Sequence, residues 1–158
     1  GRLEVLSAEA WDERQSKLGI EPLGPDFTAD LLHGLSRESR VAVKTWLMDQ
    51  KRVVGVGNIY ANEALFRAKI DPRKPAHSLT RPRARRLAEA IREVLRESIE
   101  FRGTTLLDYR DASGGEGAFA ARLKVYDRKG EPCTVCGKPI GRIVQGGRST
   151  FYCAGCQK

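Results

Sequence analysis

Four cysteines, all within the last 26 residues, constrain this 158-residue chain more than any other feature of its sequence. They form two Cys-x2-Cys pairs separated by 16 residues: Cys133, Cys136, Cys153 and Cys156. A structural zinc site takes four thiolates in a tetrahedron, and each close pair can supply one edge of it. Because four thiolates leave no position for water, we expect one structural Zn²⁺. The alternative, two disulfides in a secreted protein, is disfavoured by the cysteine-free remainder of the chain.

The 16 residues between the cysteine pairs predict a β-hairpin. Residues 139–144 and 148–152 are rich in β-formers, and the glycine pair Gly146-Gly147 between them favours a tight turn. Arg148 follows this turn directly, so it is expected at the hairpin tip, where an arginine can contact a phosphate or a base. From position alone, a solvent-exposed turn arginine is the better explanation.

Charge is distributed unevenly along the chain. The net charge is +8, but residues 1–35 carry three basic and seven acidic side chains, so residues 36–158 carry a balance of +12. A basic block of this kind predicts a polyanionic partner, nucleic acid before an acidic membrane surface, with an ordinary solvated surface as the alternative. No apolar run approaches the roughly 20 residues needed to span a bilayer, so we expect no membrane partner.

Two short helices are predicted in the first half of the chain. Residues 37–48 carry apolar side chains spaced four apart, with Ser36 as N-cap and Lys44 beside the apolar face. A second helix begins after Gly55-Val56-Gly57, with Asn58 as its N-cap. Backbone N–H groups at such a helix start can bind an anion, although a simple interhelical turn explains the two glycines equally well.

A long helix is predicted from Thr80 to about Phe101, because its apolar residues recur with a period of 3.6. Four arginines in its first turns oppose the helix dipole unless an anion compensates: Arg81, Arg83, Arg85 and Arg86. Residues 108–118 follow as a glycine-rich stretch, which predicts either a flexible loop over a site or a linker.

The order of these motifs resembles the bacterial formamidopyrimidine-DNA glycosylase family. Residues 46–66 are similar to its helix–two-turn–helix segment, residues 103–106 and 126–133 to two further motifs, and residues 148–157 to its zinc-finger hairpin. The similarity runs from about residue 15 to the C-terminal residue.

The resemblance implies a mainly α fold, with a helix–two-turn–helix DNA-binding domain followed by a small four-cysteine zinc β-hairpin. Residues 1–24 would be a remnant of a preceding β-domain and linker, residues 25–125 the helical domain, and residues 126–158 the zinc finger. The implied partner is double-stranded DNA that contains oxidised bases or abasic sites. We also expect a monomer in the bacterial cytoplasm.

Enzymes of this family flip an oxidised purine such as 8-oxoguanine out of the duplex, because the bond to be cut is unreachable inside the stack. They excise the base through a Schiff base and then cleave the strand. Two alternatives stay open: an endonuclease VIII-type enzyme for oxidised pyrimidines, which residues 58–61 resemble less, and a non-enzymatic zinc-ribbon module that binds nucleic acid.

Carried over by position, the resemblance assigns DNA-binding roles to five residues: Lys44, Gly57, Asn58, Tyr126 and Arg148. Arg148 is also implicated in the final elimination, the one catalytic role expected in this chain. The cysteines would hold zinc and position Arg148, and the loop at 108–118 would close over the extruded base.

One departure from the family is large. The family's nucleophile is the amine of an N-terminal proline, followed by a glutamate, whereas this sequence starts Gly1-Arg2. Residues 1–6 look like a late strand of the family's N-terminal β-sandwich. We therefore expect a chain that binds DNA but does not excise bases.

Overall fold

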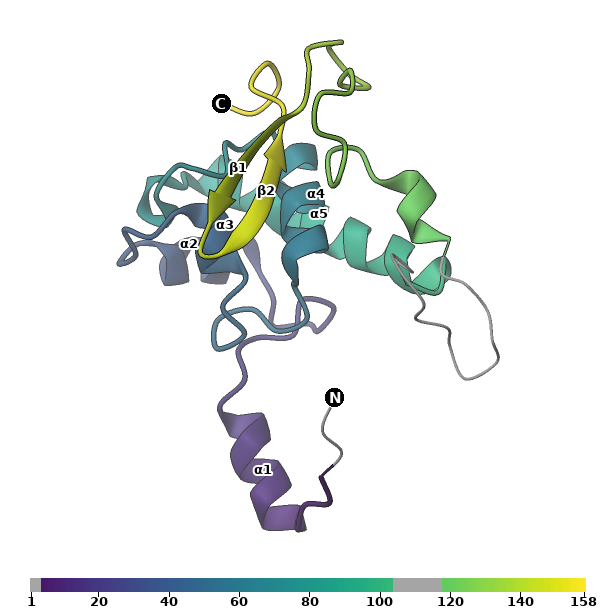
Figure 1. Ribbon diagram of the computed structural model, residues 1–158. Coiled ribbons are helices and arrows are strands. Elements are labelled where there is room, and N and C mark those ends of the chain that lie inside the picture. The colour runs from purple at the N-terminus through teal and green to yellow at the C-terminus, as the bar shows by residue number, and fades with distance from the viewer. Residues whose placement is uncertain (1–3, 104–117) are drawn as a thin grey trace.

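The computed structural model describes residues 4–103 and 118–158, and its centre is a layer of packed helices (Figure 1). Three helices form this layer: α2 (Ala29–Ser36), α4 (Asn58–Arg67) and α5 (Arg81–Glu100). Most of the glycine-rich stretch 108–118 lies outside the described residues, as do residues 104–106 and the first three residues. The mainly α class predicted from the sequence is confirmed.

The long helix α5 forms where its apolar period predicts, with Thr80 as its N-cap and Phe101 as its C-cap. Leu87, Ile91 and Val94 recur at three- and four-residue intervals and are all buried against α2 and α4. Truncating one such buried leucine or isoleucine to alanine costs about 2–5 kcal/mol. This apolar stripe is therefore one of the main contributors to the core of the helical body.

The predicted helix over residues 37–48 is wrong in its first half. Ser36 does not cap it, because Ser36 is the last residue of α2, and α3 (Val43–Leu47) begins seven residues later. The intervening backbone pairs with residues 74–77: Val43 N–H donates to the Lys74 carbonyl at 2.7 Å, and Ala76 N–H donates to the Val41 carbonyl at 2.8 Å. These tertiary bonds take the groups that an α-helix would have paired internally.

The β-hairpin forms as predicted, from β1 (Gly141–Gln145) and β2 (Arg148–Tyr152), with Gln145 opposite Arg148. Gly146 and Gly147 both have positive φ, +56° and +72°. A two-residue hairpin turn of this kind needs positive φ at both positions, which glycine adopts without a steric penalty. The hairpin lies over α4 (Figure 1).

Two short 3-10 helices connect these elements: η1 (Ala76–Ser78) and η2 (Phe119–Arg122). Near the N-terminus, α1 (Ala8–Ser16) is capped by Ser7, buries no side chain and lies apart from the other helices (Figure 1). Residues 4–6 form no strand, and Val5 is 96% exposed, so the strand expected over residues 1–6 is absent from its described part. None of the described helices is long and apolar enough to cross a membrane.

Candidate nucleic-acid interface and zinc site

The four cysteine sulfurs converge on one point. The sulfurs of Cys133 and Cys156 lie 3.8 Å apart, those of Cys136 and Cys153 lie 3.4 Å apart, and all four lie within 4.8 Å of one another. A tetrahedral zinc with Zn–S bonds of about 2.3 Å places its sulfurs roughly 3.8 Å apart. All four thiols are free rather than disulfide-bonded. The donor set and spacing therefore fit one structural zinc, as the sequence predicts.

Two residues around the cysteines fix the zinc finger in place. The buried Gln157 side chain accepts the Cys153 N–H at 2.8 Å and donates to the Ile70 carbonyl at 2.9 Å, which ties the second knuckle to the segment after α4. A Cβ on Gly155 would lie 2.9 Å from the Cys136 sulfur, so a larger residue would crowd a metal ligand. The metal site is thus part of the framework that holds the hairpin.

A cavity of about 340 Å³ lies at the start of α4 and brings together four of the five predicted DNA-binding residues. Its wall consists of Gly57, Asn58, Ile59, Tyr60, Tyr126 and Arg148. Arg148 is exposed beside the hairpin turn, while the Tyr126 ring packs edge-on against Phe151 of β2, with centroids 5.1 Å apart. The wall thus presents a guanidinium, a phenol, an amide and the start of a helix.

The N-cap of α4 differs from the prediction. Gly57, with extended backbone (φ −86°, ψ −174°), is the cap, and Asn58 is the first helical residue. No side chain caps this helix, and the space beside Gly57 is open for 4 Å. Uncapped N–H groups at a helix start carry partial positive charge and suit an anion. Asn58 therefore belongs to the first turn of α4, where it lines the cavity and its amide oxygen accepts a hydrogen bond from Asn62 at 3.5 Å.

Lys44 is the predicted DNA-binding residue that does not line the cavity. It is fully buried in α3 beneath the hairpin, and its ammonium donates to the Ser149 carbonyl at 3.3 Å. Burial and, to a smaller degree, the positive charge of Arg148 lower the pKa of Lys44 to about 8. The two cations are therefore close enough to repel each other, and an anion near Arg148 would relieve that repulsion.

Two side chains that the sequence did not single out hold the cavity wall together. Asn62 of α4 accepts the Phe151 N–H at 2.7 Å and donates to the Asn58 carbonyl at 2.7 Å. These bonds join β2 to the first turn of α4. The signal in the sequence was a polar residue on an otherwise apolar helix face.

The second is Glu63, a fully buried carboxylate. It accepts backbone N–H groups from Lys124, Val125 and Tyr126 at 2.9–3.1 Å. A carboxylate surrounded by three donors is a strong anchor for a turn. Glu63 therefore positions the segment that carries Tyr126 against the helix that carries Asn58.

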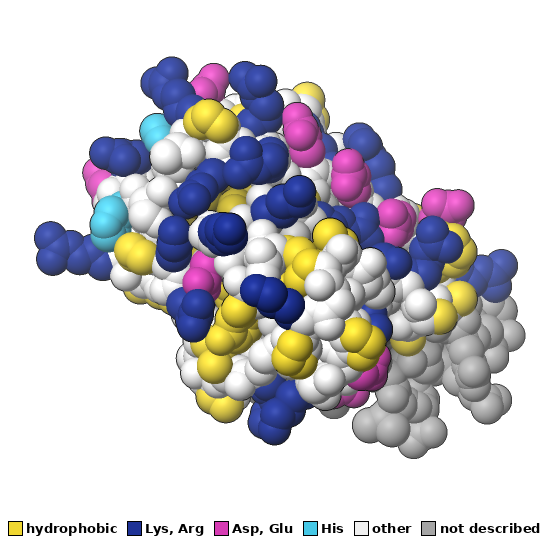
Figure 2. All heavy atoms as spheres, turned by 90° about the horizontal axis from the view of Figure 1, so that it is seen from above, with side chains coloured by type: hydrophobic (Ala, Val, Ile, Leu, Met, Phe, Trp, Pro, Cys, Tyr) yellow, Lys and Arg dark blue, Asp and Glu magenta, His cyan; other side chains and the backbone are white. Residues whose placement is uncertain are grey.

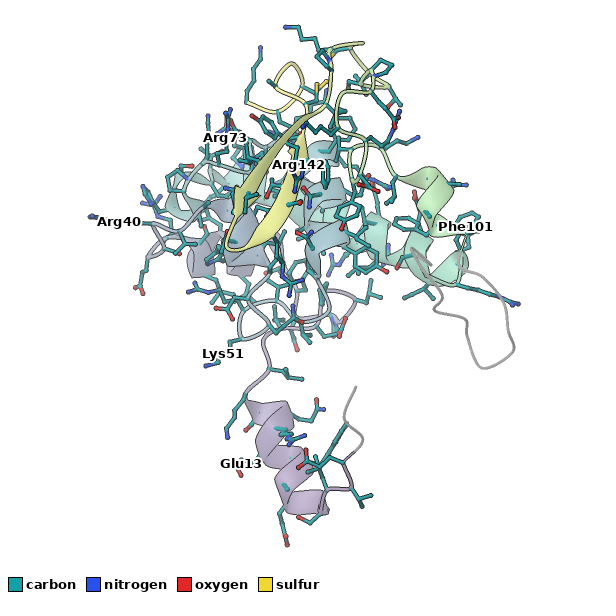
Figure 3. All side chains as sticks on the ribbon, in the orientation of Figure 1. Glu13, Arg40, Lys51, Arg73, Phe101 and Arg142 are labelled. Atoms are coloured by element: carbon teal, nitrogen blue, oxygen red, sulfur yellow. The ribbon has the colours of Figure 1, made fainter. Side chains whose placement is uncertain are left out.

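The outer face of the hairpin is cationic. Arg142 donates twice to the Ser149 hydroxyl, at 3.0 and 2.8 Å, and Arg73 stacks over the Tyr152 ring at 4.7 Å (Figure 3). Figure 2 shows that Lys and Arg side chains outnumber Asp and Glu on the end of the molecule that carries the zinc finger. This end of the molecule is thus positively charged.

Two family models match this chain, one in its helical part and one at its C-terminal end. Residues 18–109 match the formamidopyrimidine-DNA glycosylase H2TH domain, and residues 130–158 match the zinc finger found in FPG and IleRS. The formamidopyrimidine-DNA glycosylase of Bordetella avium is 55% identical over 142 residues, which cover 89% of this chain and 52% of that protein. That of Photorhabdus laumondii is 54% identical over 140 residues, with the same two coverages.

Solved structures of formamidopyrimidine-DNA glycosylases are also similar to this chain. The MutM (Fpg) protein of Thermus thermophilus superposes with a TM-score of 0.87 at 46% identity, over 93% of this chain and 57% of that one. The Lactococcus lactis Fpg in complex with DNA containing an abasic site superposes with a TM-score of 0.89 at 34% identity, over 97% and 57%. The chain therefore spans about half the length of the relatives that it matches.

Proposed function

This chain belongs to the formamidopyrimidine-DNA glycosylase family, and from that premise we propose that it is the DNA-gripping part of a base-excision repair enzyme. The whole enzyme would remove oxidised purines, such as 8-oxoguanine and formamidopyrimidines, from duplex DNA. It would also cleave the strand at the resulting abasic site. The chain would act as a monomer on damaged double-stranded DNA.

The observation that carries this proposal is the cavity at the start of α4. A protein that holds a flipped nucleotide also contacts the DNA backbone, and each bound phosphate needs donors in place of water. The uncapped N–H groups after Gly57, the Asn58 amide and the Arg148 guanidinium are such donors, and all three line one cavity. Tyr126 completes the wall with a hydroxyl that can donate to a phosphate oxygen.

The roles of the individual side chains follow from their chemistry. Arg148 is always charged and can hold one phosphate with two parallel hydrogen bonds. In this proposal the extruded nucleotide would bind beside the hairpin tip, and Arg148 would assist the final elimination. Lys44, buried beneath the same tip, would raise the local positive potential and reach a phosphate only if the Ser149 bond opened.

Zinc, when bound to the four cysteines, would supply rigidity rather than chemistry. Four thiolates fill a tetrahedral shell and leave no open position for a substrate or water. Holding both ends of the hairpin segment in this way fixes the direction in which Arg148 points.

We further propose that the chain alone binds a lesion without excising it. Its 158 residues contain no counterpart of the family's N-terminal proline with a following glutamate. None of the described residues that line the cavity is a lysine, and the amine of Lys44 is buried and hydrogen-bonded, so it is a poor candidate for a Schiff base.

Fluorescence anisotropy with two duplexes tests this function, one intact and one with a central abasic site. We expect tighter binding to the abasic duplex, and a loss of about tenfold or more for Arg148→Ala and Asn58→Ala. Lys17→Ala is the matched control, because it removes a positive charge at the end of α1, away from the cavity. Equal affinity for both duplexes would contradict damage recognition.

Borohydride trapping on a duplex with 8-oxoguanine opposite cytosine tests the second part. No covalent adduct should form if the excising amine is absent. An adduct on that duplex would show that this chain has its own working amine, and the proposal of an inactive chain would then be wrong.

A further inference from the structure

Two cavities adjoin at the C-terminal end of α4. The first, of about 290 Å³, is lined by Phe66 at the base and by Thr134 and Val135 of the first zinc knuckle. The second, of about 440 Å³, lies between α5 and η2. Arg67 and Lys124 line both, so the two cavities form one continuous surface, which we call the back surface.

The first cavity is apolar where it is deepest. Phe66 is only 6% exposed and closes its floor, whereas Val135 is 67% exposed at its rim. The Val135 N–H donates to the Cys133 sulfur at 3.4 Å, so a metal ligand fixes the backbone of this exposed valine. A rigid, half-buried apolar cavity of this kind suits one apolar side chain of a partner.

The second cavity is cationic. Arg67 forms two hydrogen bonds with Glu97, at 3.0 and 2.8 Å, and Arg122 lies 4.0 Å from the same carboxylate. The Glu97 carboxylate thus pairs with both arginines. The ammonium groups of Lys69 and Lys124 form no ion pair within the described parts of the chain, although both line the back surface. The back surface therefore carries an excess of positive charge.

We propose that the back surface is a docking site for an acidic peptide segment of a partner protein, anchored by one apolar side chain. The anchor would enter the cavity between Phe66 and Val135, and the flanking carboxylates would meet Lys69, Lys124 and Arg122. Charge complementarity favours an acidic partner, and the apolar cavity favours a peptide, since a nucleic-acid backbone offers no apolar side chain to fill it.

The back surface and the DNA-binding cavity lie at opposite ends of one helix. The DNA-binding cavity is lined by Gly57 and Asn58 at the start of α4, and the back surface by Phe66 and Arg67 at its end. Ten helical residues separate the two by about 15 Å along the axis. We therefore expect a peptide and a DNA duplex to bind at the same time, and the inference does not depend on the proposed repair function.

The test uses the zinc-loaded chain and a fluorescein-labelled peptide of aspartates around a central phenylalanine. We expect saturable binding that weakens about tenfold for Val135→Asp and for Lys124→Glu. A peptide with alanine in place of phenylalanine, and one with asparagines in place of the aspartates, should each bind more weakly by a similar factor. Lys17→Glu on α1 is the control and should bind the peptide as the parent chain does.

Three control measurements accompany the test: zinc content, affinity for the abasic duplex, and peptide affinity in the presence of that duplex. Val135 and the Lys124 side chain are exposed, so zinc content and abasic-duplex affinity should stay unchanged in both variants, which shows that they fold. A saturating abasic duplex should leave the peptide affinity unaltered. Absence of binding, equal binding of the alanine peptide, or displacement of the peptide by duplex would each overturn the proposal; displacement would assign the back surface to nucleic acid.

Discussion

At the scale of single residues, the buried carboxylate of Glu63 is the most consequential side chain outside the zinc site. Glu63→Gln keeps its shape but turns one oxygen into an N–H group that faces backbone donors. Leaving a buried donor unpaired costs about 1–3 kcal/mol, so we expect a loss of about 2–3 kcal/mol in the free energy of unfolding. Urea denaturation measures it, and DNA affinity should fall as well, because Tyr126 loses its anchor.

Glu89→Gln is the matched control for that substitution, because Glu89 is exposed on α5. Its unfolding free energy should match that of the parent chain. If the two glutamine variants proved equally stable, the bonds from Glu63 to residues 124–126 would contribute nothing, and its positioning role would be refuted.

Lys44 predicts a specific pH dependence of stability. Its pKa is lowered to about 8 in the folded chain, first by burial and then by Arg148, against about 10.4 in an unfolded chain. Between these two values the unfolded state binds more protons, so the contribution of Lys44 to stability rises with pH through this window. Below about pH 8 both states are protonated, and the buried charge is a constant cost.

Lys44→Met should remove this dependence. We expect the variant to be more stable than the parent chain at neutral pH and the difference to shrink as the pH approaches about 10. Urea unfolding of both proteins across this pH range measures the difference in unfolding free energy. Protonation of the zinc-binding thiolates affects both proteins equally, so it drops out of that difference. A constant difference at every pH would show that Lys44 titrates normally.

At the scale of elements, the helices and strands that local interactions determine are predictable from the local sequence pattern. The 3.6-residue period of α5 and the glycine pair of the hairpin turn are local signals, and both elements form within one or two residues of expectation. The segment 37–42 departs because its backbone pairs with residues 74–77, a tertiary interaction that no local pattern encodes.

In the candidate site, too, some residues are predictable from the sequence and others are not. The cysteines are evident from spacing alone, and the resemblance to a family supplies Gly57, Asn58, Tyr126 and Arg148. A polar residue on an otherwise apolar helix face is the only local signal for Asn62. The roles of Glu63 and Asn62 do not follow from such a signal, because a polar residue in a helix usually faces water. Their partners lie 61–63 and 89 positions away in the chain.

The second zinc knuckle, which contains Gly155, has room for no side chain at that position. Gly155→Ala places a Cβ 2.9 Å from the Cys136 sulfur, so this ligand must shift. Disturbing the surroundings of a metal ligand typically weakens metal binding about 10–100-fold, and we expect at least the lower value. Competition with a chromogenic chelator measures the change. Gly34→Ala in α2 is the control, because a Cβ there meets nothing within 4 Å; zinc affinity equal to that of this control would contradict the steric argument.

At the scale of the whole molecule, α4 connects every functional part. Its first turn lines the cavity that we propose binds DNA, Asn62 binds the hairpin, Glu63 binds the segment 124–126, and its last turn lines the back surface. The helix is buried along most of its length, so a substitution in it disturbs several sites at once. The half-buried residues at its two ends are therefore the cleaner probes of function.

Because the whole molecule has a net charge of +8, we expect the proposed DNA binding to release counterions. The logarithm of the association constant should fall linearly with the logarithm of salt concentration, with a slope of about −0.9 for each phosphate neutralised. Arg148→Ala should therefore lower the affinity and also make the slope shallower by about 0.9, because one charged contact is lost. Asn58→Ala should lower the affinity with the slope unchanged, because an amide displaces no counterion. Anisotropy titrations of the abasic duplex at several salt concentrations separate the two. Equal slopes for Arg148→Ala and the parent chain would mean that Arg148 meets no phosphate, and that the cavity holds DNA through its neutral donors alone.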